Sequence, residues 1–273
     1  MRLLERVHQD CEFTSCRDYL TQRLLARHGF NNVIMTGDPA WYDLNYLGKT
    51  LTPPNEIKTV ALSVPARAIF QDQCIELVNR CRAMFADATI LCTFHHGWEV
   101  TENVMSGHAK EMNMLREKLA SQGHEVVNLA GDLQHMERVY DKAEIHVGYR
   151  LHAHLFFLSH QKPSFLLEED GRGRGASEAL GFKGIPAWSR APGDLMLAEL
   201  PIGRHIRSVA RKALRAGLRP RADAVEEALA LIKEETSNGF SRFMCVRQVI
   251  DRTYREQLVR FLNGLPAKRH QRG

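Results

Sequence analysis

An arginine and a histidine that suit anion binding follow a short apolar run near the middle of the chain. Arg150 and His152 come just after Ile145 to Gly148, and a leucine-rich stretch with helical spacing follows them. Where a helix begins at the carboxyl end of a strand, its unpaired N–H groups and positive dipole end favour a bound anion. An arginine fork and an imidazole add charge-assisted hydrogen bonds. From spacing alone, the alternative is a solvated helix start, because residues two apart do not share a helix face.

The elements that must position this pair are a strand, a helix and a second strand. Ile145 to Gly148 has the composition of a buried strand, and the apolar residues from Leu151 to Leu158 recur at three and four positions. A proline-containing break then precedes another buried run, Ser164 to Leu167. A strand–helix–strand unit of this kind predicts a parallel sheet.

The same alternation upstream predicts a Rossmann-like α/β fold. The expected strands are Thr59 to Val64, Ala88 to Phe94 and His124 to Leu129, and the expected helices are Ile69 to Met84, Met112 to Ser121 and Leu133 to Lys142. Right-handed crossovers place the carboxyl ends of all these strands on one edge of the sheet, where ligands bind in open α/β folds.

Four histidines at these strand ends raise metal binding as an alternative. His95 and His96 follow one strand, and His152 and His154 follow another. Neighbouring histidines on an extended chain point to opposite sides, and no carboxylate lies at a recognised ligand spacing. We therefore expect no metal and no cofactor.

Composition excludes several classes of protein. The chain has 273 residues, of which 44% are hydrophobic and 25% charged, an ordinary mix for a folded soluble protein. No apolar run approaches the length that crosses a bilayer, and the N-terminus has no signal-peptide core, so we expect the cytoplasm. The six cysteines form no Cys-x-x-Cys pair, which predicts reduced thiols and no zinc site or disulfide framework.

The net charge of +5 is unevenly distributed. One segment carries seven basic residues with no acid between them, namely Arg204, Arg207, Arg211, Lys212, Arg215, Arg219 and Arg221. It lacks the interleaved aromatic residues typical of nucleic-acid binding, so we expect no nucleic-acid partner. A solvated linker and a site for acidic sugar polymers or lipid phosphates remain open.

Glycine alternates with arginine from Glu169 to Gly175, which predicts a loop before a helix that begins at Ala176. Glycines allow a backbone to approach a phosphate, and Arg172 and Arg174 would clamp it. Composition favours the alternative, a flexible and solvated loop.

The first fifty residues hold a second pattern. It predicts a helix from Tyr19 to His28 with Ser15 as its N-cap, and then a strand from Val33 to Met35 that ends in a turn. Arg17 would be a surface charge at the helix start.

Both patterns resemble the polysaccharide pyruvyl transferase family. Its members have a strand that runs into Arg-Leu-His-Ala, an apolar helix and a proline-led strand, as in GYRLHAHLFFLSHQKPSFLLEEDGRGRGASEALG at 148–181. They also have a strand ending in Ser-x-Arg-Asp and a later one ending in Gly-Asp-Pro-Ala, as at Ser15 to Asp18 and Gly37 to Ala40. The family's usual tyrosine-aspartate and lysine are absent from the loop after Glu168.

The resemblance implies an architecture. We expect a Rossmann-like parallel sheet flanked by helices, similar to the C-terminal half of a GT-B-type fold. Residues 1–50 are expected to be the remnant of an N-terminal Rossmann-like domain, 56–200 a Rossmann-like domain with the Arg-Leu-His motif, and 201–273 basic C-terminal helices. The match extends to about residue 182 and leaves the family's first part unrepresented.

The resemblance also implies a chemistry. Pyruvyl transferases build a cyclic ketal on two hydroxyls of a sugar from phosphoenolpyruvate and release phosphate. Anion clamps and an acid are needed, and histidine titrates near neutral pH. By this resemblance the expected catalytic residues are Arg150 and His152, and the expected substrate-binding residues are Arg17, His96, Arg172 and Arg174.

Two other functions stay open, a glycosyltransferase that uses a nucleotide sugar and a non-catalytic subunit of polysaccharide biosynthesis. The expected partners are phosphoenolpyruvate and a glycan or lipid-linked sugar acceptor, together with a second copy of the chain or a separate N-terminal-type chain. The basic segment is compatible with a location of the protein at the inner face of a membrane.

Overall fold

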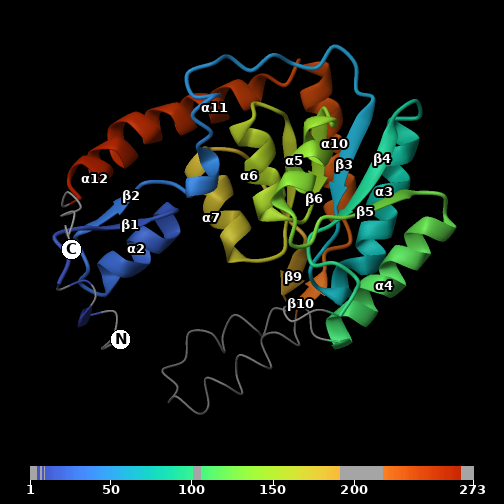
Figure 1. The fold of residues 1–273 in the computed structure, drawn as a ribbon, viewed down its shortest axis with the longest axis horizontal. Helices are drawn as coiled ribbons and strands as arrows, with labels where there is room; N and C mark the ends of the chain where they lie inside the picture. Colours follow the sequence, from blue (N-terminus) through green and yellow to red (C-terminus); the bar gives the residue numbers. More distant parts are fainter. Residues whose placement is uncertain (1–4, 7, 9, 101–105, 191–217, 266–273) are drawn as a thin grey trace, which may run out of the picture.

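Six parallel strands form the central sheet of the computed structural model, which describes residues 5–6, 8, 10–100, 106–190 and 218–265. In spatial order they are β5 (Glu125–Asn128), β4 (Thr89–Phe94), β3 (Thr59–Ser63), β6 (Ile145–Gly148), β7 (Ser164–Glu168) and β8 (Ile185–Pro186) (Figure 1). The expected Rossmann-like α/β fold is thereby confirmed, and the carboxyl ends of the strands share one edge.

Helices cover both faces of this sheet because successive strand residues point to opposite sides. Val60 and Leu62 of β3 join the larger core cluster, whereas Ala61 joins the smaller one. The larger cluster takes residues from α3 (Gln71–Met84), α4 (Ser106–Ser121) and α10 (Ala224–Ser237), the smaller one from α5 (Leu133–Asp141), and α6 (Leu151–Ser159) contributes to both. The helix predicted from Met112 starts earlier, at Ser106.

The predicted strand–helix–strand unit is present as β6, α6 and β7. The two strands pair in parallel, with His146 opposite Ser164. Every residue of α6 from Ala153 to Ser159 is buried, because the helix packs between the sheet, the short helix η1 (Pro39–Trp41) and α11 (Ser241–Thr253). A helix that is apolar all round is a buried one, which explains its leucine-rich composition.

The glycine-arginine segment was predicted as a loop, and this prediction is wrong. It forms the start of α7 (Gly171–Leu180), whose first turn is capped by Asp170 accepting a hydrogen bond from the Arg172 N–H at 2.9 Å. The glycines serve packing there, since a Cβ on Gly175 would lie 2.8 Å from Cγ of Asp18. Arg172 and Arg174 therefore project from a helix.

A small unit precedes the main sheet, made of β1 (Thr14–Cys16), α2 (Tyr19–Arg27) and β2 (Val33–Met35). Its two strands pair in parallel and form a separate sheet, and the helix and the Val33–Met35 strand agree with the sequence pattern. The predicted N-cap is wrong, because Ser15 lies within β1. Asp18 caps the helix instead, accepting a hydrogen bond from the Thr21 N–H at 2.7 Å.

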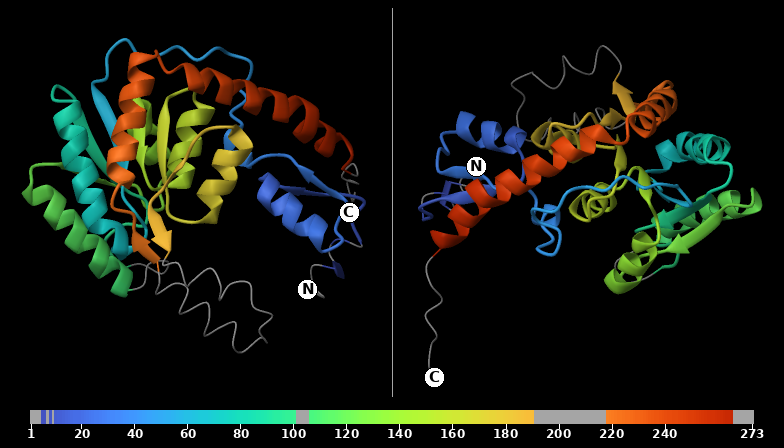
Figure 2. Two further views of the ribbon diagram at one scale, coloured as in Figure 1. Left: turned by 180° about the vertical axis from the view of Figure 1, so that it is seen from behind. Right: turned by 90° about the horizontal axis from the view of Figure 1, so that it is seen from above.

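A long helical segment joins the main sheet to this small unit. It consists of α11 (Ser241–Thr253), the π-helical turn η3 (Tyr254–Leu258) and α12 (Val259–Asn263), and it crosses the molecule in both views of Figure 2. The rings of Phe13 and Phe261 lie 5.6 Å apart where it reaches the small unit. The domain boundaries at residues 50, 56 and 200 stay predictions.

Most of the basic segment lies outside the described residues, as do Lys268, Arg269 and Arg272. Arg219 belongs to β10 (Leu218–Pro220), which pairs antiparallel with β9 (Trp188–Arg190). Arg221 forms ion pairs with Asp223 and Glu227. Among the described helices, none combines the length and the apolar character that a membrane span requires.

Candidate functional site

The segments after β6 and β7 meet at the carboxyl edge of the sheet and line a small pocket of about 20 Å³. Its lining includes Arg150, His152, Glu168, Glu169 and Arg172. Two of these residues carry the predicted catalytic roles and a third was predicted to bind substrate. The structure therefore brings Arg150, His152 and Arg172 together, as the strand-end argument required.

The backbone of Arg150 is fixed by a close approach of β6 to β3. Gly148 has φ of +144°, and a Cβ there would lie 2.4 Å from the carbonyl oxygen of Ser63. Only glycine fits this position. The Arg150 N–H donates a hydrogen bond to Ser63 Oγ at 3.0 Å, and Arg150 is the N-cap residue of α6.

The Arg150 guanidinium is a largely buried cation with unused donors. Its side chain is 17% exposed, and its ion pair with Glu169 is long, with 3.9 Å between Nη1 and Oε2. Burial lowers the pKa of Arg150, and the negative charge of Glu169 opposes this effect. Within the described part of the chain the guanidinium makes no hydrogen bond, so its fork remains available to an anion.

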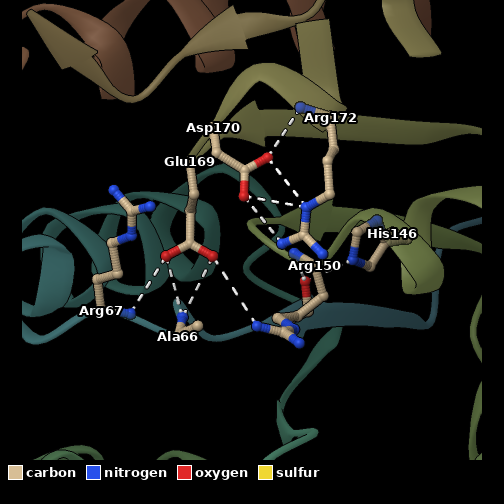
Figure 3. Close-up of polar contacts among 8 residues, drawn as sticks. Ala66, Arg67, His146, Arg150, Glu169, Asp170 and Arg172 are labelled. Atoms are coloured by element: carbon tan, nitrogen blue, oxygen red, sulfur yellow. Dashed lines mark hydrogen bonds and ion pairs between the residues drawn. The ribbon is translucent and has the colours of Figure 1, made fainter. Parts of the chain in front are cut away.

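Glu169 was not predicted as a site residue, yet it lines the pocket. Its carboxylate accepts hydrogen bonds from the Ala66 N–H at 3.0 and 3.2 Å and from the Arg67 N–H at 3.2 Å. Burial raises the pKa of Glu169, while these hydrogen bonds and the charge of Arg150 lower it. Figure 3 shows the carboxylate between the two N–H groups and the Arg150 side chain. Its place directly after β7 was the signal that could have identified it.

Arg172 differs from Arg150 because its guanidinium already has a partner. Asp170 accepts hydrogen bonds from Nε at 3.0 Å and from Nη2 at 2.8 Å, and these bonds raise the pKa of Arg172 (Figure 3). His152 is exposed at the rim of the same pocket. An anion in this pocket would meet the free guanidinium of Arg150 and the guanidinium of Arg172, which is already bound to the Asp170 carboxylate.

The two histidines after β4 are neutral at pH 7. Burial lowers the pKa of His95 to about 3, with the positive charge of Arg150 adding to the effect, and His95 Nε2 lies 2.5 Å from the hydroxyl of Tyr140. Burial also lowers the pKa of His96 to about 4, again with help from Arg150. His96 is thus in the electric field of Arg150, although it does not line the pocket.

Arg17 and Arg174 lie away from this pocket. Arg17 lines an apolar groove of about 550 Å³ between the small unit and the C-terminal helix, and its Nε pairs with Asp18 at 3.4 Å. Arg174 is exposed on α7, where its charge lowers the pKa of the buried Glu168. Their substrate-binding roles stay predictions. The described residues include no cluster of three or more histidines, cysteines or carboxylates placed to hold a metal.

Comparisons with known proteins place these residues in context. A family model described as "Polysaccharide pyruvyl transferase" matches residues 1–171 of the chain. Among curated proteins, no significant match was found.

Solved structures give more distant likenesses. The Staphylococcus aureus MnaA–UDP co-structure has a TM-score of 0.48 and 13% identity, and the alignment covers 95% of this chain and 62% of that one. The wall teichoic acid polymerase TagF has a TM-score of 0.32 and 11% identity, and the alignment covers 97% of this chain and 61% of that one. A GtfA/B complex has a TM-score of 0.36 and 11% identity, and the alignment covers 92% of this chain and 45% of that one. The chain thus spans less than two thirds of the length of each of these structures.

Proposed function

The chain belongs to the polysaccharide pyruvyl transferase family, and we propose that it is a transferase that moves a pyruvyl group from phosphoenolpyruvate to two hydroxyls of a sugar in a polysaccharide. The acceptor is a glycan or a lipid-linked sugar, and the basic segment would allow work at the inner face of a membrane. No separate cofactor is required by this chemistry.

One observation carries the proposal, the mostly buried Arg150 guanidinium that makes no hydrogen bond within the described residues. A desolvated cation of this kind gains most from a ligand with paired oxygen acceptors. Phosphoenolpyruvate offers two such groups, a carboxylate and a phosphate. Arg172 also lines the pocket and would contact the second group, although Asp170 now pairs with it.

Ketal formation needs two carbon–oxygen bonds to the central carbon of the donor. The oxygen of the first sugar hydroxyl bonds to this carbon and that hydroxyl gives up its proton, while the carbon–carbon double bond breaks and the methylene carbon takes one proton and becomes methyl. The second hydroxyl then replaces the phosphate, which leaves with the proton of that hydroxyl. The intermediate carries developing positive charge on the central carbon, and Arg150 would hold the anionic groups in place.

His152 is the side chain we assign to proton delivery. It lies at the rim of the Arg150 pocket and is open to solvent, from which it can regain a proton. His95 and His96 are neutral at pH 7, with pKa values of about 3 and about 4, and so are poor acids. Arg17, His96 and Arg174 would contact the donor or acceptor outside the pocket.

The direct test is thermal stability with phosphoenolpyruvate, since a ligand that binds only the folded protein raises the melting temperature. We expect a rise in the wild type, no rise in Arg150→Ala, and an unchanged rise in Arg80→Ala, which removes an exposed arginine of α3. The next experiment measures the release of phosphate from phosphoenolpyruvate in the presence of candidate sugar acceptors. A rise with nucleotides and none with phosphoenolpyruvate would refute the proposal in favour of a nucleotide-sugar glycosyltransferase.

A further inference from the structure

A chain of buried polar side chains runs from the Arg150 backbone into the core. The Arg150 N–H donates to Ser63 Oγ at 3.0 Å, and Ser63 Oγ lies 2.8 Å from His146 Nε2. The other ring nitrogen, His146 Nδ1, lies 2.7 Å from Ser164 Oγ, which in turn lies 2.7 Å from His154 Nδ1. The four side chains beyond Arg150 are fully buried.

We propose that His146 acts through Ser63 as a positioning residue for Arg150, holding the start of α6 where the Arg150 guanidinium meets an anionic ligand. The anion-binding part of this inference rests on the proposed function. Its structural part, the fixing of the Arg150 backbone by His146, does not.

The imidazoles of His146 and His154 are both neutral at physiological pH. Burial lowers the pKa of His154 to about 3 and the pKa of His146 well below its usual value. A neutral imidazole has one donor and one acceptor nitrogen. The hydrogen bonds of the buried series Ser63–His146–Ser164–His154 therefore all run in one direction, from donor to acceptor.

Counting hydrogen bonds gives that direction. If Ser63 donates to His146 Nε2, then His146 Nδ1–H donates to Ser164, and Ser164 donates to His154 Nδ1. Only His154 Nε2 then lacks a partner, as it does among the described residues. The reverse direction would also leave the Ser63 hydroxyl proton without a recorded acceptor, so the structure favours His146 in its Nδ1–H form.

The position of Ser63 matters because Arg150 has little else to hold its N–H. As the N-cap residue of α6, Arg150 makes no side-chain capping bond, and its N–H bonds to Ser63 Oγ. Rotation of the Ser63 side chain about its Cα–Cβ bond would move Oγ and release this contact. His146 prevents the rotation by accepting the Ser63 proton, and small displacements of a binding arginine are costly in a preorganised site.

Two amide variants of His146 separate positioning from general stability. His146→Gln places its amide near the Nε2 position and can keep the bond to Ser63, whereas His146→Asn places its amide near Nδ1 and can keep only the bond to Ser164. Both lose one buried hydrogen bond, so similar losses of melting temperature are expected. A purely structural role would affect both variants alike.

The first readout is hydrogen exchange of the Arg150 amide, which needs no ligand. We expect exchange to be at least about tenfold faster in His146→Asn than in His146→Gln, in line with a hydrogen bond of about 1.4 kcal/mol. The nitrogen chemical shifts of His146 in the wild type should show a protonated Nδ1. Equal exchange in the two variants, or an Nε2–H tautomer, would overturn the inference.

The second readout is the dissociation constant for phosphoenolpyruvate, expected to rise about tenfold in His146→Asn and to stay within about twofold of wild type in His146→Gln. Equal weakening in both variants would refute the positioning role at the binding site. Absence of binding in the wild type would instead refute the proposed donor, while the exchange result would still decide whether His146 holds Arg150.

Discussion

The Glu169 carboxylate lies 3.9 Å from the Arg150 guanidinium while the N–H groups of Ala66 and Arg67 hold it in place. The protein thus supplies its own anion to the site that we assign to an anionic substrate. The backbone hydrogen bonds and the charge of Arg150 favour the ionised carboxylate, whereas burial raises its pKa. A substrate anion at Arg150 must compete with it or displace it.

Removing this charge should strengthen anion binding. We expect Glu169→Gln to lower the dissociation constant for sulfate roughly tenfold, because an ion pair of about 1.4 kcal/mol no longer has to be broken. Calorimetric titration at constant ionic strength measures the change. Glu178→Gln, which removes an exposed carboxylate of α7 that pairs with Arg23, should have no effect. Weaker binding in Glu169→Gln would mean that Glu169 orients Arg150 for its ligand.

Gly148 should tolerate no side chain. A Cβ would meet the Ser63 carbonyl oxygen at 2.4 Å with φ at +144°, so Gly148→Ala should cost more than about 3 kcal/mol or prevent folding. Gly107→Ala, near the start of α4, meets no atom of the described residues within 4 Å and should change the stability by less than about 1 kcal/mol. Urea unfolding of the two variants makes the comparison, and equal stability would contradict the close approach of β6 to β3.

Buried neutral histidines make the fold sensitive to acid. The folded-state pKa of His154 is lowered to about 3, so the unfolded chain takes up a proton near pH 6.5 while the folded protein does not. The stability that His154 contributes is therefore present above about pH 6.5 and is lost as pH falls towards about 3. Between about pH 6.5 and 5 the loss is about 2 kcal/mol.

Comparison with a variant isolates this effect, because burial raises the pKa of Glu168 and Glu169 and their protonation opposes it. The free energy of unfolding of His154→Leu should fall less steeply than that of the wild type over this pH range. His28→Gln, at an exposed position, should follow the wild type. Parallel curves for His154→Leu and wild type would show that His154 is not held neutral.

Local periodicity was enough to predict the central unit. Ile145 to Gly148 and Ser164 to Leu167 are apolar runs on either side of a helical pattern, and all of the information lies within a few residues. Arg150 and His152 could be placed at the carboxyl edge for the same reason. The edge itself follows from the handedness of parallel crossovers.

Contacts between distant residues could not be predicted in this way. Glu169 meets Ala66 across 103 positions, and His146 meets Ser63 across 83. The start of α7 was missed because glycine composition favours a loop, whereas Asp170 caps a helix there. For Glu169 and His146 the deciding partner belongs to another element, and no local pattern indicates it.

The contact between α7 and the small N-terminal unit depends on one glycine. A Cβ at position 175 would lie 2.8 Å from Asp18 Cγ, so Gly175→Ala should push α2 and α7 apart, whereas Gly171→Ala meets nothing within 4 Å. We expect faster proteolysis of the region around α2 in Gly175→Ala only. Equal protection in both variants would show that the small unit is held by the C-terminal helix alone.

The last prediction concerns His152 and separates catalysis from binding. If His152 delivers the proton to the methylene carbon, His152→Gln should lower kcat for phosphate release about 10² to 10⁴-fold and leave the dissociation constant for phosphoenolpyruvate within about threefold. Arg150→Ala should do the opposite and weaken binding first. His28→Gln is the matched control on an exposed histidine. An unchanged kcat in His152→Gln, with donor binding intact, would assign the proton to solvent or to the acceptor hydroxyl, and the role of His152 would then be limited to the rim of the anion pocket.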